Sequence, residues 1–203
     1  MRIATWNINS VRLRIDLVTK FLNESDIDVL CLQETKTEDK FFPGMALADA
    51  GWSHHAFRGE KSYNGVAIIS RLPLGQIHHK DWAEKIDCRH ICAQIENGPS
   101  IHNFYVPAGG DVPDREENPK FGHKLDFLSE MTHHFTDQRP QNAILVGDLN
   151  IAPLAEDVWS SKQLLKVVSH TPVETEALKR LMSDGGWVLS LIHISEPTRL
   201  STI

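Results

Sequence analysis

Short apolar runs of strand length alternate along this chain with stretches whose apolar residues recur at helical spacing. Strand patterns cover residues 2–7, 28–34, 62–71 and 143–150, and a hairpin pattern joins residues 90–96 to residues 100–106 through Asn97-Gly98-Pro99. Helical patterns cover residues 10–24, 119–135 and 173–184, and Gly185-Gly186 closes the last of them. This alternation predicts an α/β fold in which strands predominate.

The composition is that of an ordinary globular domain. Of the 203 residues, 41% are hydrophobic and 24% are charged, which excludes a disordered chain, a collagen-like chain and a coiled coil. No apolar run is long enough to span a membrane, and a strand pattern begins at the N-terminus without a charged-then-apolar leader. The 3 cysteines have no CxxC spacing, so neither a disulfide framework nor a zinc site is indicated. We therefore expect one cytoplasmic domain with no membrane association.

The charge balance excludes one class of nucleic-acid binder. The chain carries 21 basic and 27 acidic residues, a net charge of −6, whereas a protein that binds nucleic acid by bulk charge would be basic. A metal-dependent enzyme is not excluded, because clustered carboxylates lower the net charge while a local basic face can still bind phosphate.

Polar side chains end three of the predicted strands. Asn7 ends the first, Glu34 follows DVLCLQ, and Asp148 and Asn150 follow AILVG. Oxygen donors at the ends of neighbouring buried strands can converge on Mg²⁺, which prefers one or two carboxylates and keeps several waters. Each residue alone is equally well explained as a strand terminus or a turn former.

Five motifs occur in order along the chain: WNINSVR, LCLQETK, YNGVAIISR, NFYVPAGG and VGDLNIAP. Together they resemble the bacterial exodeoxyribonuclease III family of apurinic/apyrimidinic endonucleases, within the endonuclease/exonuclease/phosphatase superfamily. The resemblance runs without evident gaps from Met1 to about Val188. It implies a four-layered α/β sandwich, in which two packed mixed sheets are flanked by helices and the site lies at one end.

The resemblance also implies the role of each site residue. Glu34 resembles the main Mg²⁺ ligand, with Asn7 beside it. Asp148 resembles the residue that orients or deprotonates the attacking water, and Asn150 its partner, so that both belong to the metal site as well as to catalysis. Tyr105 resembles the family's active-site tyrosine, whose hydroxyl lies near the phosphate.

The implied reaction is metal-assisted hydrolysis of a DNA phosphodiester. It would cut double-stranded DNA on the 5′ side of an abasic site and release nucleotides or blocking groups from 3′ ends, with Mg²⁺ as cofactor and Mn²⁺ as an open alternative. The cation would offset charge on the phosphoryl and leaving-group oxygens, and a carboxylate would act as general base. The family expectation is a monomer.

Four further residues are candidate contacts to DNA phosphates: Arg12, Asn64, Arg71 and Lys124. The alternative for each is an ordinary surface position, since exposed Lys and Arg are the norm.

The family pattern stops after Val188. The last residues, LSLIHISEPTRLSTI, lack the family's later aspartate motif and its terminal Ser-Asp-His motif, and the string from Leu189 to Arg199 matches a translated transposon-end adapter used in DNA sequencing libraries. We therefore expect residues 1–188 to be the N-terminal portion of the family's domain, with an incomplete second sheet. Residues 189–203 are then adapter translation, and the chain as written is expected to be inactive.

Two alternatives stay open. Because the Asp-His motif is missing, the chain can be a DNA-binding remnant without catalysis. The second alternative is a phosphodiesterase or phosphatase of the same superfamily that acts on another phosphate substrate.

Overall fold

A computed structural model describes residues 1–190. The predicted adapter segment, residues 189–203, falls outside these residues except for Leu189 and Ser190, so its assignment stays a prediction. Across the described residues, every helix is too short or too polar to cross a lipid bilayer.

The chain folds as two compact units. The first, here called the sheet unit, comprises residues 1–107 and 140–150. The second, here called the helical unit, comprises residues 108–139 and, of the described residues, 151–190. The expectation of one domain over residues 1–188 stays a prediction.

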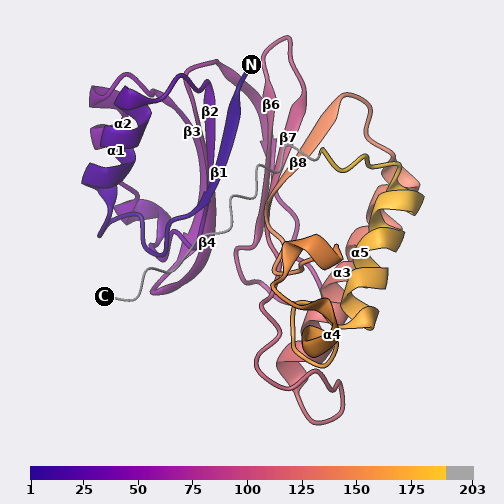
Figure 1. The fold of residues 1–203 in the computed structure, drawn as a ribbon. Helices are drawn as coiled ribbons and strands as arrows, with labels where there is room; N and C mark the ends of the chain where they lie inside the picture. Colours follow the sequence, from indigo (N-terminus) through magenta and orange to yellow (C-terminus); the bar gives the residue numbers. More distant parts are fainter. Residues whose placement is uncertain (191–203) are drawn as a thin grey trace. The chain divides into compact units, whose positions relative to one another are not determined.

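The sheet unit contains two mixed sheets of four strands each (Figure 1). Sheet A has the order β1-β2-β4-β3 and sheet B the order β5-β6-β7-β8. The β1–β2 and β7–β8 pairs are parallel and the others antiparallel. The strands are β1 (Ile3–Asn7), β2 (Val29–Gln33), β3 (His54–Glu60), β4 (Tyr63–Ser70), β5 (Leu74–His78), β6 (His90–Ile95), β7 (Ser100–Tyr105) and β8 (Ala143–Asp148).

Sheet A has a core on each of its faces. Leu30 and Leu32 of β2 pack under α1 (Ile15–Glu24) and α2 (Gly44–Asp49), whereas Val29 and Cys31 face sheet B. Because successive side chains of a strand point to opposite faces, a strand buried on both faces needs the unbroken apolar run seen in its sequence. Figure 1 shows the resulting order of helices, sheet A and sheet B within this unit.

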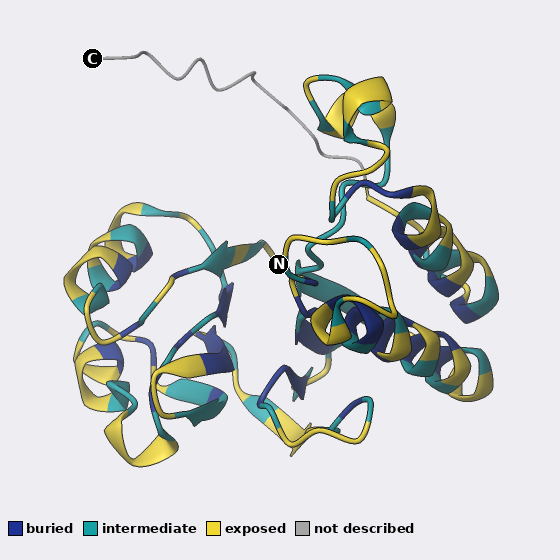
Figure 2. Ribbon diagram, turned by 90° about the horizontal axis from the view of Figure 1, so that it is seen from below, coloured by how far each residue is buried: buried dark blue, intermediate teal, exposed yellow. Residues whose placement is uncertain are grey.

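The helical unit is built around α3 (Pro119–Gln138) and α5 (Pro172–Gly185), with the short α4 (Ser161–Leu164) between them in sequence. Both long helices begin with proline in the first turn, where the missing N–H costs no hydrogen bond. Asn118 caps α3, and Gly186, with a φ of 71°, ends α5 in the left-handed conformation that glycine favours. In each unit, buried residues follow the strands and inner helix faces, and exposed residues follow the loops (Figure 2).

The predicted α/β class with two packed mixed sheets and flanking helices is confirmed. Every predicted strand and helix is present, although α1 begins later than expected because residues 11–14 form turns. Two strands, β3 and β5, were not predicted. Each lies at the edge of its sheet; β5 is mostly exposed and β3 is only partly buried along most of its length, so no apolar alternation marks either strand in the sequence.

Candidate active site

The ends of β1 and β2 run side by side beyond the sheet. Backbone hydrogen bonds join Ile8 N to Gln33 O at 3.0 Å and Ser10 N to Glu34 O at 2.7 Å. Glu34 has a φ of 54°, in the left-handed region that a non-glycine residue rarely adopts. Such a conformation costs about 1–3 kcal/mol and persists where surrounding contacts hold it, most often at functional sites. The turn directs the Glu34 side chain into the cluster described next.

A single amide bridges two carboxylates in this cluster. The Asn7 side-chain nitrogen Nδ2 donates to Glu34 Oε1 and to Asp148 Oδ2, each at 2.8 Å. Asn7 Oδ1 accepts from the backbone N–H of Asn9 at 3.2 Å. The ends of β1, β2 and β8 therefore meet at one point, and Asn7 presents a donor to both carboxylates.

Tyr105 and Lys36 complete the environment of Glu34. The Tyr105 hydroxyl donates to Glu34 Oε1 at 2.8 Å, and the Lys36 ammonium lies 2.8 Å from Glu34 Oε2 and 2.6 Å from Asn9 Oδ1. Both Glu34 oxygens are thus engaged, on a side chain that is 18% exposed. The sequence interpretation did not include Lys36, although it lies within the LCLQETK motif.

These contacts determine the protonation of both groups. Burial acts to raise the pKa of the Glu34 carboxyl. Hydrogen bonds from Asn7, Lys36 and Tyr105, together with the lysine charge, lower that pKa by more, so it lies below its usual value. Burial, the hydrogen bond to Glu34 and the glutamate charge all raise the pKa of the Tyr105 phenol. At neutral pH the pair is therefore a carboxylate that accepts from a protonated phenol.

Asp148 is held by the turn that follows β8. The backbone N–H of Asn150 donates to Asp148 Oδ1 at 3.1 Å, and Asn150 Nδ2 donates to the Val106 carbonyl at 2.8 Å. Asn150 has a φ of 52°, which asparagine tolerates better than most residues. The turn fixes the Asp148 carboxylate against the bridging amide of Asn7.

Buried side-chain hydrogen bonds connect the two sheets beside this cluster. Gln33 Nε2 donates to Asn103 Oδ1 at 2.7 Å, and Asn103 Nδ2 donates to the carbonyls of Leu32 and Ala67, both at 2.9 Å. Gln33 directly precedes Glu34, and Asn103 lies two residues before Tyr105. A fully satisfied buried network of this kind specifies one alignment of the sheets. The sequence interpretation missed it, because an amide inside an apolar run gives no signal of its partner.

The donor chemistry of the cluster fits a hard divalent cation. Two carboxylates, Glu34 and Asp148, share the Asn7 amide group, and Mg²⁺ sites in proteins use one or two carboxylates with waters in the remaining positions. Within residues 1–190, no group of three or more His, Cys, Asp or Glu side chains forms a closed metal cage. Two carboxylates would leave most of the coordination positions of such a cation to water.

The arginine candidates for phosphate contact lie in the sheet unit. Arg12 is exposed, and its guanidinium carbon lies 5.4 Å from the centre of the Phe41 ring. The Arg71 guanidinium is already engaged, since it stacks over Trp52 at 4.6 Å and donates to the Leu22 carbonyl at 3.2 Å. Arg12 is therefore the arginine better placed to meet a ligand from solvent.

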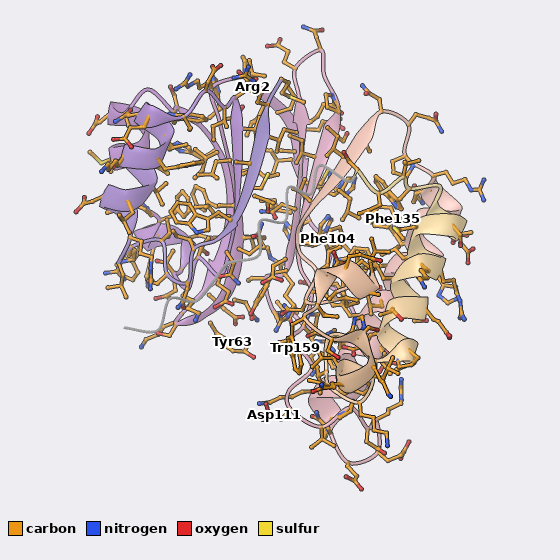
Figure 3. All side chains as sticks on the ribbon, viewed as in Figure 1. Arg2, Tyr63, Phe104, Asp111, Phe135 and Trp159 are labelled. Atoms are coloured by element: carbon orange, nitrogen blue, oxygen red, sulfur yellow. The ribbon has the colours of Figure 1, made fainter. Side chains whose placement is uncertain are left out.

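Asn64 is buried, at 2% exposure, and joins two segments of the sheet unit. Its side-chain Nδ2 donates to Glu60 Oε1 at 3.0 Å and to the Asp87 backbone carbonyl at 2.9 Å. Its backbone carbonyl accepts from the backbone N–H of Lys36 at 2.8 Å. Tyr63, the neighbouring residue, projects outward near the turn between β3 and β4 (Figure 3). Because the Asn64 side chain is buried and already hydrogen-bonded, we leave it out of the proposed DNA surface.

Lys124 is fully buried in the helical unit. Its ammonium pairs with Glu174 at 2.5 Å, and both side chains are 0% exposed. Glu174 also accepts from the backbone N–H of Ser169 and Thr171 and from the Thr171 hydroxyl, as a capping residue of α5. A buried ammonium in such a pair ties α3 to the start of α5, so we also leave Lys124 out of the proposed DNA surface. The exposed lysine of α3 one turn earlier is Lys120.

Lys124→Met is expected to lower the free energy of unfolding by about 3 kcal/mol, because it removes the cation paired with a buried carboxylate. Chemical denaturation followed by circular dichroism measures the change. Lys120→Met is the matched control, since an exposed position should alter stability by no more than about 0.5 kcal/mol. Equal stability of the two variants would contradict the structural role of Lys124.

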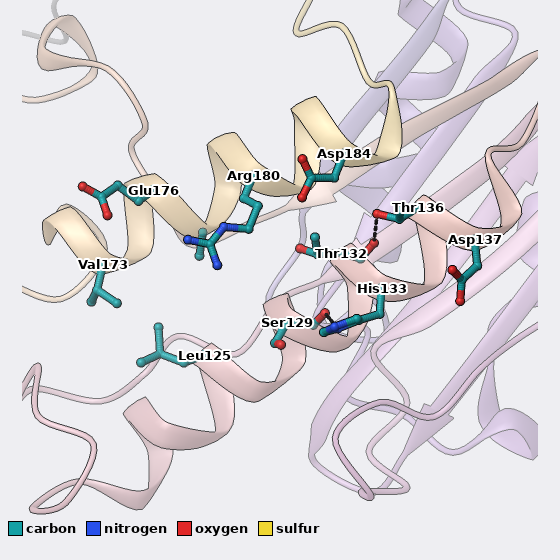
Figure 4. Close-up of a pocket in the computed structure, with 11 residues that line it drawn as sticks. Leu125, Ser129, Thr132, His133, Thr136, Asp137, Val173, Glu176, Arg180 and Asp184 are labelled. Atoms are coloured by element: carbon teal, nitrogen blue, oxygen red, sulfur yellow. Dashed lines mark hydrogen bonds between the residues drawn. The ribbon is translucent and has the colours of Figure 1, made fainter.

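A separate cavity of about 400 Å³ lies between α3 and α5 of the helical unit (Figure 4). Ser129 and His133 of α3 and Glu176, Arg180 and Asp184 of α5 contribute its polar wall. None of the predicted catalytic residues lines it, so the cavity and the carboxylate cluster are different features.

Comparison with known proteins identifies the family to which the chain is similar. A model of the Endonuclease/Exonuclease/phosphatase family matches residues 4–190. The chain is 28% identical over 165 residues to exodeoxyribonuclease III of Haemophilus influenzae, covering 78% of this chain and 60% of that protein. It thus spans less than two thirds of this relative.

Solved structures give the same picture. A Neisseria 3′ phosphatase bound to a product DNA hairpin matches with a TM-score of 0.83 and 31% identity, covering 91% of this chain and 71% of that one. An AP endonuclease from Archaeoglobus fulgidus matches with a TM-score of 0.82 and 34% identity, covering 90% and 70% respectively.

Proposed function

Because the chain belongs to the endonuclease/exonuclease/phosphatase family, we propose that its carboxylate cluster serves Mg²⁺-dependent hydrolysis of DNA phosphodiester bonds. The substrates are duplex DNA with abasic sites and duplex DNA with 3′ ends. The observation that carries the proposal is the bridge from Asn7 to Glu34 and Asp148, with the Tyr105 hydroxyl on the same glutamate. The names of the relatives, which include nucleases and a DNA-bound phosphatase, support the DNA branch of the family.

Glu34 and Asp148 would hold the cation, which when bound supplies charge stabilisation for the phosphoryl and leaving-group oxygens. Asn7 holds the two carboxylates at a fixed separation through its donor group. Asp148 would also act as the general base, with its two oxygens oriented by the Asn7 amide and by the backbone N–H of Asn150. Tyr105 directs a neutral hydroxyl toward the site, which adds a dipole without adding negative charge that would repel the phosphate. Arg12 is the proposed phosphate contact on the surface.

The alternatives are a DNA-binding protein without catalysis and a phosphatase for another phosphate ester. The DNA-binding alternative is the one that the sequence interpretation left open, and the phosphatase alternative rests on the breadth of the family. The proposal and its two alternatives each predict a different result with the same set of substrates.

The test is an assay of the purified 203-residue chain on a fluorescent duplex with one abasic site, in Mg²⁺ and in EDTA. Cleavage on the 5′ side of the abasic site that requires Mg²⁺ supports the proposal, even at a low rate. Binding without cleavage, measured by fluorescence anisotropy, assigns the chain to the non-catalytic alternative. Faster hydrolysis of inositol or lipid phosphates than of DNA assigns it to the phosphatase alternative.

A matched variant excludes contaminating nuclease. Glu34→Gln keeps the size of the side chain and an oxygen for the Asn7 and Tyr105 donors, but removes the charge that would hold the cation. Purified in the same way, this variant should lose the Mg²⁺-dependent cleavage. Undiminished cleavage would place the activity outside the cluster.

A further inference from the structure

Arg89 is a buried arginine that contacts Tyr105 in two ways. Its guanidinium carbon lies 4.8 Å from the centre of the Tyr105 ring, and its Nη1 donates to the Tyr105 carbonyl at 3.2 Å. The backbone N–H of Tyr105 in turn donates to the Arg89 carbonyl at 2.8 Å. The side chain is only 6% exposed, so the charge is removed from water against the face of the tyrosine.

A chain of contacts holds Arg89 in place. Its Nε donates to Asp87 Oδ2, and the Asp87 carbonyl accepts from Asn64 Nδ2 at 2.9 Å. The Asn64 carbonyl accepts from the backbone N–H of Lys36, in the turn that positions Glu34. Asn64 therefore connects Asp87, which holds Arg89, to the turn that carries Glu34.

The Tyr105 side chain is contacted at its hydroxyl and on the face of its ring. Its hydroxyl is bound to Glu34, and its face is covered by the planar guanidinium. Cation–π contacts of this kind strengthen when the cation is desolvated, and a planar guanidinium restricts a stacked ring in a way that a lysine ammonium does not. A phenol fixed in this way presents its hydroxyl in one direction.

We propose that Arg89 is a positioning residue, which acts on the reaction by holding the Tyr105 phenol in the geometry in which its hydroxyl meets Glu34. The expected effect of Arg89 on the cleavage rate rests on the proposed function, whereas its expected effect on the position of the Tyr105 ring does not. The two are tested separately.

The structural test uses ¹⁹F NMR of the chain labelled with 3-fluorotyrosine. The chain has only 2 tyrosines, so in a Tyr63→Phe background the spectrum reports Tyr105 alone. Arg89→Met should shift and broaden this resonance, and Arg89→Lys should restore it only in part. An unchanged resonance in Arg89→Met overturns the proposal.

Arg58→Met is the matched control for the loss of a buried arginine. Arg58 is 12% exposed and pairs with Asp81 at 2.6 Å, as Arg89 pairs with Asp87, and it is not part of the catalytic cluster. This variant should leave the Tyr105 resonance and the cleavage rate unchanged. If it shifts the resonance as much as Arg89→Met does, the effect comes from general destabilisation and the proposal is wrong.

The kinetic test is a double-mutant cycle with Tyr105→Phe. Arg89→Met is expected to lower kcat about tenfold with little change in KM, a size typical of supporting residues. In the Tyr105→Phe background the same substitution should have almost no further effect, because its target hydroxyl is absent. Additive losses, or a loss confined to KM that steepens with salt, would assign Arg89 to direct phosphate binding and overturn the proposal. If the chain cleaves no DNA, the proposed function fails and the NMR result alone decides the role of Arg89.

Discussion

In a 203-residue chain that cleaves DNA, an Asp148→Asn variant is expected to lose about 10²–10⁴-fold of the Mg²⁺-dependent cleavage rate while keeping its fold. The substitution removes the proposed general base and one of the two carboxylates that would hold the cation. It keeps an oxygen that can accept from the Asn7 amide or from the Asn150 backbone. Gel-based cleavage of the abasic-site duplex measures the rate, and thermal unfolding checks the fold.

DNA affinity separates this expectation from simple misfolding. Removing a negative charge beside the bound phosphate should leave the Kd for duplex DNA equal or lower, as measured by anisotropy in EDTA. The free energy of unfolding should change by no more than about 1 kcal/mol, the usual size of one hydrogen bond. An Asp148→Asn chain that cleaves at the parent rate would remove Asp148 from the mechanism.

Gly147→Ala is expected to lower the free energy of unfolding by about 4 kcal/mol or more, a size that few single substitutions reach. Gly147 pairs with Phe104 across the parallel β7–β8 contact and has a φ of 141°. A Cβ atom there would lie 1.9 Å from the Phe104 carbonyl oxygen, so backbone has to move. The strand end that carries Asp148 would move with it. Urea denaturation measures the loss.

Gly75→Ala is the matched control in the same sheet. Gly75 lies in β5, and an added Cβ would meet nothing closer than Gln94 at 3.7 Å, an ordinary contact distance. Its stability should change by no more than about 0.5 kcal/mol. If Gly147→Ala were as stable as Gly75→Ala, the close approach of β8 to Phe104 would not be a constraint on the fold.

The sequence predicted the elements in which apolar residues form an unbroken run or recur at a regular spacing. β2 and β8 are unbroken apolar runs, and α3 and α5 carry apolar residues at helical spacing with a proline start. The edge strands β3 and β5 escaped prediction for the opposite reason. Most of β5 is exposed, and β3 is only partly buried along most of its length, so neither strand shows an apolar alternation in its sequence.

The site shows the same division. Polar residues at three strand ends indicated a cluster in advance, and the structure brings Asn7, Glu34 and Asp148 together. The sequence did not indicate that Lys36 would engage the glutamate, or that Arg89 would cover the tyrosine. It also left the exposure of each lysine open, and Lys124 proved to be fully buried.

By itself, the sequence determined the long helices, the strands other than β3 and β5, and the residue types available at the predicted strand ends, because these depend on local periodicity and on neighbours along the chain. Only the tertiary structure decided which of these residues meet. Asn7 and Asp148 are 141 positions apart, and Gln33 and Asn103 are 70 apart, yet each pair shares a hydrogen bond. Such contacts depend on the alignment of two sheets, which is set by packing and buried polar pairing rather than by any local pattern.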